Sequence, residues 1–305
     1  MTAVIQTEKL TKYYGKHRGI IDVDLEVQEG ESFGFLGPNG AGKTTMIRIL
    51  LDHIRPTSGH ATVFGIDTTH DPVAIHRRLG YLPGEFSLYE KLTGGQTLDY
   101  FGNLRGGIDR TYQKQLIERL EVDPTRRFRE YSKGNKQKIG LIIALQHRPD
   151  LLLLDEPTSG LDPLIQQEFY AVIREAKEEG RTVFLSSHIL SEVEKTADRV
   201  AIIRGGELAR VDRTEALRDL AHHQVELVFT GPVPVEAFSA LPGVSDVTSE
   251  DHVLRMRVAG NITDVVRTAS HYELADFISR EPSLEETFLA EYGKSAVPAV
   301  EVASR

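Results

Sequence analysis

The chain has 305 residues, of which 40% are hydrophobic and 27% are charged, as in a globular protein with one large domain and a smaller one, or with two medium ones. Its formal net charge of −9 argues against a protein whose main role is to coat nucleic acid, so no nucleic-acid partner is expected. The sequence holds no cysteine, which excludes a disulfide framework, a thiol nucleophile and a thiolate metal site.

The first elements in chain order predict a β-hairpin and then an alternation of strands and helices. Residues 3–15 and 20–31 read as two strands joined by a turn, and Val23, Leu25 and Val27 alternate with polar residues in the second. Short apolar runs that suit strands buried on both faces of a mostly parallel sheet follow at residues 32–38, 151–157 and 182–188. Helical patterns occur at residues 43–53, about 110–121, 135–147, 162–179 and 189–196. The alternation predicts an α/β fold with a mainly helical insert at about residues 85–150.

The pattern changes after about residue 218, and residues 219–293 predict a second, smaller domain. Strands are expected at Gln224–Phe229, Val244–Ser249, His252–Ala259 and Leu274–Ser279, and helices at Val235–Leu241 and Ile262–Tyr272. The order β-α-β-β-α-β is typical of a ferredoxin-like α+β domain. A short helix is expected from Ser283, and residues 294–305 are predicted to be a flexible tail.

A glycine-rich loop, "GPNGAGKTT", joins a predicted strand to a predicted helix and fits the pattern G-x-x-x-x-G-K-T. Its glycines let the backbone wrap closely, so that successive N–H groups and the helix N-terminus point at phosphate oxygens. Lys43, which we count among the catalytic residues, should reach the β- and γ-phosphates of a nucleotide, and the Thr44 hydroxyl should bind Mg²⁺. The strand–loop–helix context argues against the alternative, a glycine-rich turn with a chance lysine. The expected nucleotide-binding residues of the loop are Gly37, Pro38, Asn39, Gly40, Ala41, Gly42, Lys43, Thr44 and Thr45.

The stretch "LLLLDE" predicts the other half of a hydrolytic site. Asp155 ends a strand that is expected to be buried, where its carboxylate can hold the ligand shell of Mg²⁺. Glu156 lies next to the expected position of the attacking water, which it can orient or deprotonate as the catalytic base. In isolation such a pair is often only an acidic strand end before a turn, but here it follows a matching phosphate loop.

A further segment, "YSKGN" at residues 131–135, lies just ahead of an apolar helix. The order "GPNGAGKTT", "YSKGN", "LLLLDEPTSGLD" and "LSSH" resembles the nucleotide-binding subunit of an ATP-binding cassette (ABC) transporter over roughly residues 3–215. The resemblance implies a P-loop NTPase fold, a RecA-like core with an antiparallel β subdomain and a helical subdomain, so residues 1–218 would form the cassette. It also implies that two such subunits enclose two ATP molecules, each site being completed by the opposite subunit.

The segment "YSKGN" stands where the family usually has L-S-G-G-Q. Ser132 and Gly134 match that pattern, whereas Tyr131, Lys133 and Asn135 depart from it. The resemblance implies that residues 132–135 contact the γ-phosphate of the ATP held by the partner chain. A hydroxyl and a backbone N–H at the start of a helix are suitable donors to phosphate, and the lysine adds positive charge. The alternative is a solvated basic turn.

Other positions carry over from the family one by one. Tyr14 matches the aromatic residue that stacks on adenine; the alternatives are a tyrosine with only a structural role in the hairpin, or Tyr13 in its place. His188 in "LSSH" matches the histidine that contacts the γ-phosphate, and it is therefore a predicted catalytic residue. Asp162 in "SGLD" matches the loop that communicates across the dimer.

One position departs from the family. A glutamine that binds Mg²⁺ and the attacking water usually follows "GYLP", but this chain continues with Gly84 and Glu85. Glycine has no side-chain ligand atom, so Glu85 is the candidate substitute as a metal ligand. The alternative is that Glu85 is an ordinary surface carboxylate.

Three stretches, "YSKGN", "GYLPGEFSLYEKLTG" and "EPSLEETFLAEYG", resemble the daunorubicin-resistance-type branch of the family. That resemblance implies an ATPase subunit that powers export of a drug-like or other hydrophobic molecule through a separate ABC-2-type permease. The ATPase would bind peripherally at the cytoplasmic face of the cell membrane as a homodimer, with a heterodimer as the alternative. Its own apolar runs fall far short of the roughly 20 residues that a membrane helix needs. For the C-terminal domain, a regulatory or dimer-supporting role is favoured.

Other functions of cassette ATPases are alternatives. Within transport, the closest alternative is the ATPase of a nutrient importer. A DNA-repair or chromosome-organising ATPase would need a long heptad-patterned insertion, which the chain lacks. A ribosome-acting protein normally carries two cassettes, whereas this sequence has one phosphate loop.

Overall fold

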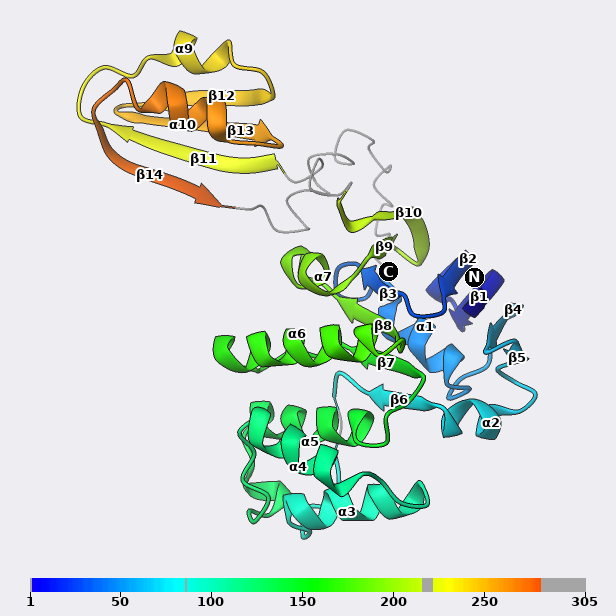
Figure 1. The fold of residues 1–305 in the computed structure, drawn as a ribbon. Helices are drawn as coiled ribbons and strands as arrows, with labels where there is room; N and C mark the ends of the chain where they lie inside the picture. The colour runs from blue at the N-terminus through cyan, green and yellow to red at the C-terminus, as the bar shows by residue number, and fades with distance from the viewer. Residues whose placement is uncertain (1, 86, 216–221, 281–305) are drawn as a thin grey trace, which may run out of the picture. The chain divides into compact units, whose positions relative to one another are not determined.

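The computed structural model describes residues 2–85, 87–215 and 222–280, which divide into two compact units at Thr214. Figure 1 shows the elements of each unit. Within these residues, no helix combines the length and the apolar character needed to pass through a bilayer.

A sheet of six strands, counted over the described residues, forms the centre of the first unit, with the order β10-β9-β3-β8-β7-β6 (Figure 1). The strands are β3 (Ser32–Leu36), β6 (Leu79–Leu82), β7 (Leu151–Asp155), β8 (Thr182–Ser187), β9 (Arg199–Arg204) and β10 (Glu207–Arg213). Neighbouring strands run parallel except β9 and β10. Every residue of β3, β7 and β8 is buried, which explains why these segments read as continuous apolar runs.

Helices follow the central strands β3, β7 and β8 of this sheet. These helices are α1 (Lys43–Leu50) after β3, α6 (Pro163–Glu178) after β7, and α7 (Leu190–Thr196) after β8. Helix α6 begins at Asp162, whose carboxylate accepts hydrogen bonds from the N–H groups of Leu164 and Ile165, and its Pro163 suits the first helical position. Because the carboxyl ends of parallel strands lie at one edge of a sheet, the loops after β3, β7 and β8 converge there.

An antiparallel sheet with the order β2-β1-β4-β5 forms the other sheet of this unit. Its strands are β1 (Ala3–Tyr14), β2 (His17–Gln28), β4 (Ser58–Val63) and β5 (Ile66–Asp67). Val23, Leu25 and Val27 of β2 are buried in one core with Met46 and Ile47 of α1. The predicted hairpin is therefore present, and its apolar face packs against the helix that follows the phosphate loop.

The predicted helical insert contains α3 (Gly94–Leu104), α4 (Arg110–Arg119), the 3₁₀ turn η1 (Phe128–Glu130) and α5 (Lys133–Leu145). A capping box begins α3, since Thr93 Oγ1 accepts from the Gln96 N–H and the Gln96 side chain accepts from the Thr93 N–H. The sequence patterns did not identify helix α2 (Pro72–Arg77) or strands β4, β5 and β6. Elements of six residues or fewer hold too few positions to show a period, and none of these four is a continuous apolar run as β7 is.

The second unit contains one antiparallel sheet with the strand order β12-β13-β11-β14. Its elements are β11 (His222–Phe229), α9 (Val235–Ser239), β12 (Val244–Glu250), β13 (Val253–Ala259), α10 (Thr263–Ala269) and β14 (Leu274–Arg280). Leu227, Leu254, Phe238 and Val265 form the centre of its own apolar core. The helix expected from Ser283 and the tail expected at residues 294–305 lie outside the described residues.

Candidate nucleotide-binding and hydrolysis site

The phosphate loop between β3 and α1 is held in a conformation that only glycine accepts at several positions. Gly42, which precedes α1, has φ of 113°, and a Cβ on it would lie 2.7 Å from the carbonyl oxygen of Gly19. A Cβ on Gly37 would lie 2.4 Å from the carbonyl oxygen of Ile203. The loop therefore passes close to the chain around it, with the N-terminus of α1 at its end. This is the geometry that presents backbone N–H groups to phosphate.

Lys43 is buried and lies across this loop. Its Nζ donates hydrogen bonds to the carbonyl oxygens of Gly37, at 2.7 Å, and Pro38, at 3.2 Å. The same ammonium forms an ion pair with Glu156, with Nζ 3.2 Å from Oε1. The lysine is therefore fixed where the strand end carrying Glu156 meets the phosphate loop.

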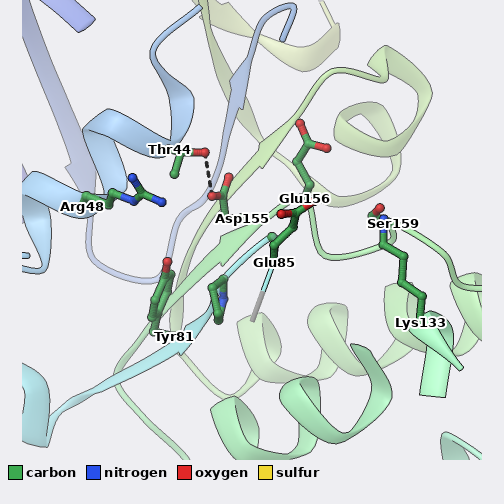
Figure 2. A pocket seen from close by; sticks show the side chains of 10 residues that line it. Thr44, Arg48, Tyr81, Glu85, Lys133, Asp155, Glu156 and Ser159 are labelled. Carbon is green, nitrogen blue, oxygen red and sulfur yellow. Dashed lines mark hydrogen bonds between the residues drawn. The ribbon is translucent and has the colours of Figure 1, made fainter. Parts of the chain in front are cut away.

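The carboxylate of Asp155 is buried at the end of β7 and holds two hydroxyl groups. Thr44 Oγ1 donates to Oδ2 at 2.8 Å, and Ser186 Oγ donates to Oδ1. Figure 2 shows the Thr44 contact. Hydroxyl and carboxylate oxygens are the protein groups that suit Mg²⁺, which usually takes one or two of them together with phosphate oxygens and water. The residues present thus fit the predicted magnesium site.

Glu156 lies between Lys43 and His188 at the edge of the sheet. Its Oε1 is 3.2 Å from Lys43 Nζ and 3.2 Å from His188 Nδ1. Its backbone has φ of 47°, a left-handed conformation that is uncommon for a side chain other than glycine, asparagine or aspartate. Such positions are concentrated at functional sites because the surrounding structure has to enforce them. The structure thus brings together the three residues that the sequence predicts to be catalytic.

A cavity of about 180 Å³ extends from these groups toward the β-hairpin. Tyr14 lines it, is 42% exposed, and has its hydroxyl 3.4 Å from Thr45 Oγ1. Tyr13, the alternative to Tyr14, is not among the lining residues, which favours Tyr14 as the residue that stacks on adenine. Arg18 also lines the cavity, and the sequence patterns did not indicate it. The other lining residues are Gly19, Asn39, Gly40, Gly42, Lys43, Thr44, Thr45 and Glu156.

A second cavity, of about 290 Å³, has Asp155 in its wall (Figure 2). Glu85 lines it together with Thr44 and Asp155, so the candidate substitute for the family's glutamine is on the metal side of the site. Burial and the charge of Asp155 raise the pKa of Tyr81 in its wall to about 12, so Tyr81 stays a neutral hydroxyl at physiological pH. The remaining lining residues are Arg48, Pro83, Gly84, Lys133, Glu156 and Ser159.

The segment 131–135 begins helix α5. Ser132 is its N-cap, and its Oγ accepts a hydrogen bond from the Asn135 N–H at 3.3 Å. A Cβ on Gly134 would lie 2.4 Å from the carbonyl oxygen of Gly160, so this helix start packs directly on the loop after Glu156. Asp162 in that loop caps α6. The roles predicted for Ser132, Lys133, Gly134, Asn135 and Asp162 toward a partner chain stay predictions.

The fold and the site together define a P-loop ATPase of the cassette type. The sequence profile of the family described as "ABC transporter" matches residues 20–159. A solved structure described as the ATP-binding subunit of an ABC transporter is 27% identical and has a TM-score of 0.65, covering 70% of this chain and 92% of that one.

Similar proteins extend over nearly all of the chain. The linearmycin resistance ATP-binding protein LnrL of Bacillus subtilis (strain 168) is 32% identical, covering 96% of this chain and 99% of its own length. The bacitracin transport ATP-binding protein BcrA of Enterococcus faecalis is 33% identical, covering 84% of each chain. The daunorubicin resistance ATP-binding protein DrrA3 of Streptomyces coeruleorubidus is 32% identical, covering 93% of this chain and 94% of its own.

The chain belongs to the ABC transporter ATP-binding proteins, and it is an ATP-binding and ATP-hydrolysing transporter subunit. The family and the cassette fold predicted from the motifs are confirmed.

Proposed function

We propose that this ATPase powers export of an antibiotic or another hydrophobic, drug-like molecule through a separate ABC-2-type permease. The observation that carries the proposal is the extent of the match to proteins named for bacitracin transport and for linearmycin and daunorubicin resistance. Two of these alignments cover more than 90% of this chain, and therefore include most of the second unit as well as the cassette.

At the site, each residue has a role that its contacts support. Lys43 exchanges its present partners for the β- and γ-phosphates of ATP, while Tyr14 supports the adenine. Thr44 and Asp155 would hold Mg²⁺, with Glu85 as a further ligand, and the ion would neutralise charge on the phosphates. Glu156 takes a proton from the attacking water, and His188 contacts the γ-phosphate.

We propose that two copies form the active unit. Residues 132–135 of one copy contact the ATP held by the other, and Asp162 joins the two sites. The packing of Gly134 on Gly160 supports this arrangement, because it ties the segment to the loop that leaves Glu156. A heterodimer with a related ATPase is the alternative assembly.

The chain is proposed to consist of a cassette at residues 1–218, an accessory domain at residues 219–293 and a tail at residues 294–305. The element order β-α-β-β-α-β and the antiparallel sheet at residues 222–280 support a ferredoxin-like accessory domain, for which we propose a regulatory or dimer-supporting role. The cassette would bind peripherally at the cytoplasmic face of the cell membrane through the permease.

Co-purification in detergent from the native membrane tests the function. We expect an affinity-tagged chain to bring down a multi-span membrane protein without any solute-binding protein, and the complex to hydrolyse ATP faster when a transported compound is added. A solute-binding protein in the complex would indicate import instead. Ribosomal particles or nucleic acid in place of a membrane protein would indicate a function outside transport.

A further inference from the structure

The cavity beside Asp155 is lined by a third carboxylate, that of Glu85. Asp155 accepts hydrogen bonds from Thr44 and Ser186, and Glu156 pairs with Lys43 and His188. Glu85 lines the same cavity but, within the described residues, its carboxylate has neither a hydrogen bond nor an ion pair. An exposed carboxylate without a partner samples several rotamers, and ordering it at a metal has an entropic cost.

Arg48 is a cation that lines the same cavity. It is on α1, four residues after Thr44, and residues at this spacing lie on one face of a helix. Its side chain extends toward Asp155 (Figure 2), and in the described part of the chain its guanidinium has neither a hydrogen bond nor an ion pair. Its charge nevertheless acts on the cavity wall, because it lowers the pKa of Tyr81, whereas the charge of Asp155 raises it.

Gly84, which stands where the family usually has the glutamine, lies next to Asp155. A Cβ on Gly84 would lie 3.4 Å from the backbone oxygen and 3.7 Å from Oδ2 of Asp155, so a side chain at this position would start next to the metal side. A side chain at position 85 starts one residue further along. It therefore needs a group that directs it back toward Asp155, and a guanidinium matches a carboxylate with two parallel hydrogen bonds.

We propose that Arg48 is a positioning residue for Glu85: its guanidinium binds the Glu85 carboxylate and holds it at the Thr44–Asp155 end of the cavity, where Glu85 serves Mg²⁺. The inference rests on the proposed metal role of Glu85. Lys133 is the competing cation, because it also lines the cavity. The stem of Lys133 lies along Gly160, since a Cβ on that glycine would be 3.4 Å from Lys133 Cγ, whereas Arg48 shares a helix face with Thr44.

A double-mutant cycle on the full-length protein tests the pair. The variants are Arg48→Ala, Lys133→Ala, Glu85→Ala and the double variants that combine Glu85→Ala with each of the other two. The readout is the Mg²⁺ concentration that gives half-maximal binding of a fluorescent ATP analogue. The Mg²⁺ dependence of phosphate release is measured in parallel. Arg77→Ala, which removes an exposed arginine from α2, is the control for loss of a positive charge. Circular dichroism melting shows that each variant is folded.

We expect Arg48→Ala and Glu85→Ala each to raise the half-saturating Mg²⁺ concentration about 2- to 5-fold, the scale of one partly exposed ion pair. The Arg48→Ala/Glu85→Ala double variant should need no more Mg²⁺ than the single variant with the higher requirement, because each change already removes the pair. Arg48→Lys should recover part of the effect, and Arg77→Ala should leave the titration unchanged. If Arg48→Ala is poorly folded, Arg48→Gln keeps the first part of the side-chain stem, removes the charge and gives the same comparison.

The outcomes separate the inference from the function on which it rests. Arg48→Ala could change the Mg²⁺ requirement equally in the native and the Glu85→Ala background, while Glu85→Ala alone also changes it. This result would overturn the pair but leave Glu85 at the metal. An unchanged titration for Glu85→Ala would remove the metal role of Glu85 and the pair with it. Coupling of Glu85 to Lys133→Ala in place of Arg48→Ala would assign the positioning role to Lys133.

Discussion

Lys43 and Glu156 form an ion pair in which Nζ lies 3.2 Å from Oε1, so the predicted phosphate-binding cation and the predicted base hold each other. The γ-phosphate of ATP has to compete with Glu156 for this ammonium. Binding of nucleotide would then release the carboxylate toward the attacking water, so that a single contact links the arrival of substrate to the readiness of the base.

Glu156→Gln separates the two roles of this carboxylate. Turnover should fall about 10²- to 10⁴-fold, the usual scale for loss of a positioned base. ATP affinity should stay the same or rise, because the amide carries no charge to compete for Lys43. Phosphate release and titration with a fluorescent nucleotide measure the two quantities. Hydrolysis at the native rate would show that Glu156 is not the base.

Mixing two inactive variants tests the proposed action of Ser132 on the partner's nucleotide. Lys43→Ala weakens nucleotide binding in its own chain, and Ser132→Arg places a bulky side chain at the surface offered to the partner. A mixed dimer has one site with both changes and one with neither, so partial ATPase activity should return. Cross-linking shows that mixed dimers form. Mixed dimers without activity would argue against action across the interface, or would mean that both sites must act together.

Gly134→Ala should destabilise the cassette, because its Cβ would lie 2.4 Å from the carbonyl oxygen of Gly160. We expect a loss of about 1–3 kcal/mol in the free energy of unfolding, the range for overpacking a close contact. Gly84→Ala is the matched control, since a Cβ there meets no atom closer than 3.4 Å. Urea unfolding followed by circular dichroism gives both values. Equal stabilities of the two variants would contradict the observed packing.

The Gly84→Gln change should make Glu85 dispensable for the metal. The glutamine would start 3.7 Å from Asp155 Oδ2 and reach the position that Glu85 is proposed to supply. In the Glu85→Ala background, it should return the Mg²⁺ requirement of hydrolysis to near the native value. Gly84→Ala in the same background adds a Cβ without a ligand and should give no recovery. Recovery by alanine as well would point to a backbone effect instead of a ligand.

His147 should make stability sensitive to acid. Burial, with the nearby charges of Arg105 and Arg181, lowers the pKa of its imidazole to about 4, while its Nε2 lies 3.1 Å from the Leu79 carbonyl oxygen. Between about pH 6.5 and 4, this histidine is therefore protonated in the unfolded chain but neutral in the folded chain. The free energy of unfolding falls as the pH falls through this window. Between pH 7 and 5, the native protein should lose about 1–2 kcal/mol more than His147→Gln in urea unfolding. Parallel losses in both proteins would contradict this origin.

The sequence predicted the parts of the site whose signals are local. Gly37–Thr45 lies between a strand and a helix, and Asp155 and Glu156 end an apolar run, so neither needed knowledge of distant contacts. Arg18 and Arg48 were missed because neither belongs to a sequence motif. Each lines a cavity only because segments remote in the sequence form the opposite wall of that cavity. For Arg48 that wall includes β6, a strand of only four residues that itself escaped detection. The contact of Gly134 with Gly160 likewise depends on how α5 is laid against a loop 26 residues later.

The place of β3 in its sheet has a consequence for how the protein is made. This strand ends at Leu36, yet its neighbours on either side are β8 and β9, which begin at Thr182 and Arg199. At roughly 5–20 residues per second, a ribosome would need about 10–30 s after making β3 to supply both neighbours. Until then the apolar strand ahead of the phosphate loop has no partner, so nascent chains ending before residue 182 should neither bind ATP nor resist protease there. Chaperone contact would be expected during that interval.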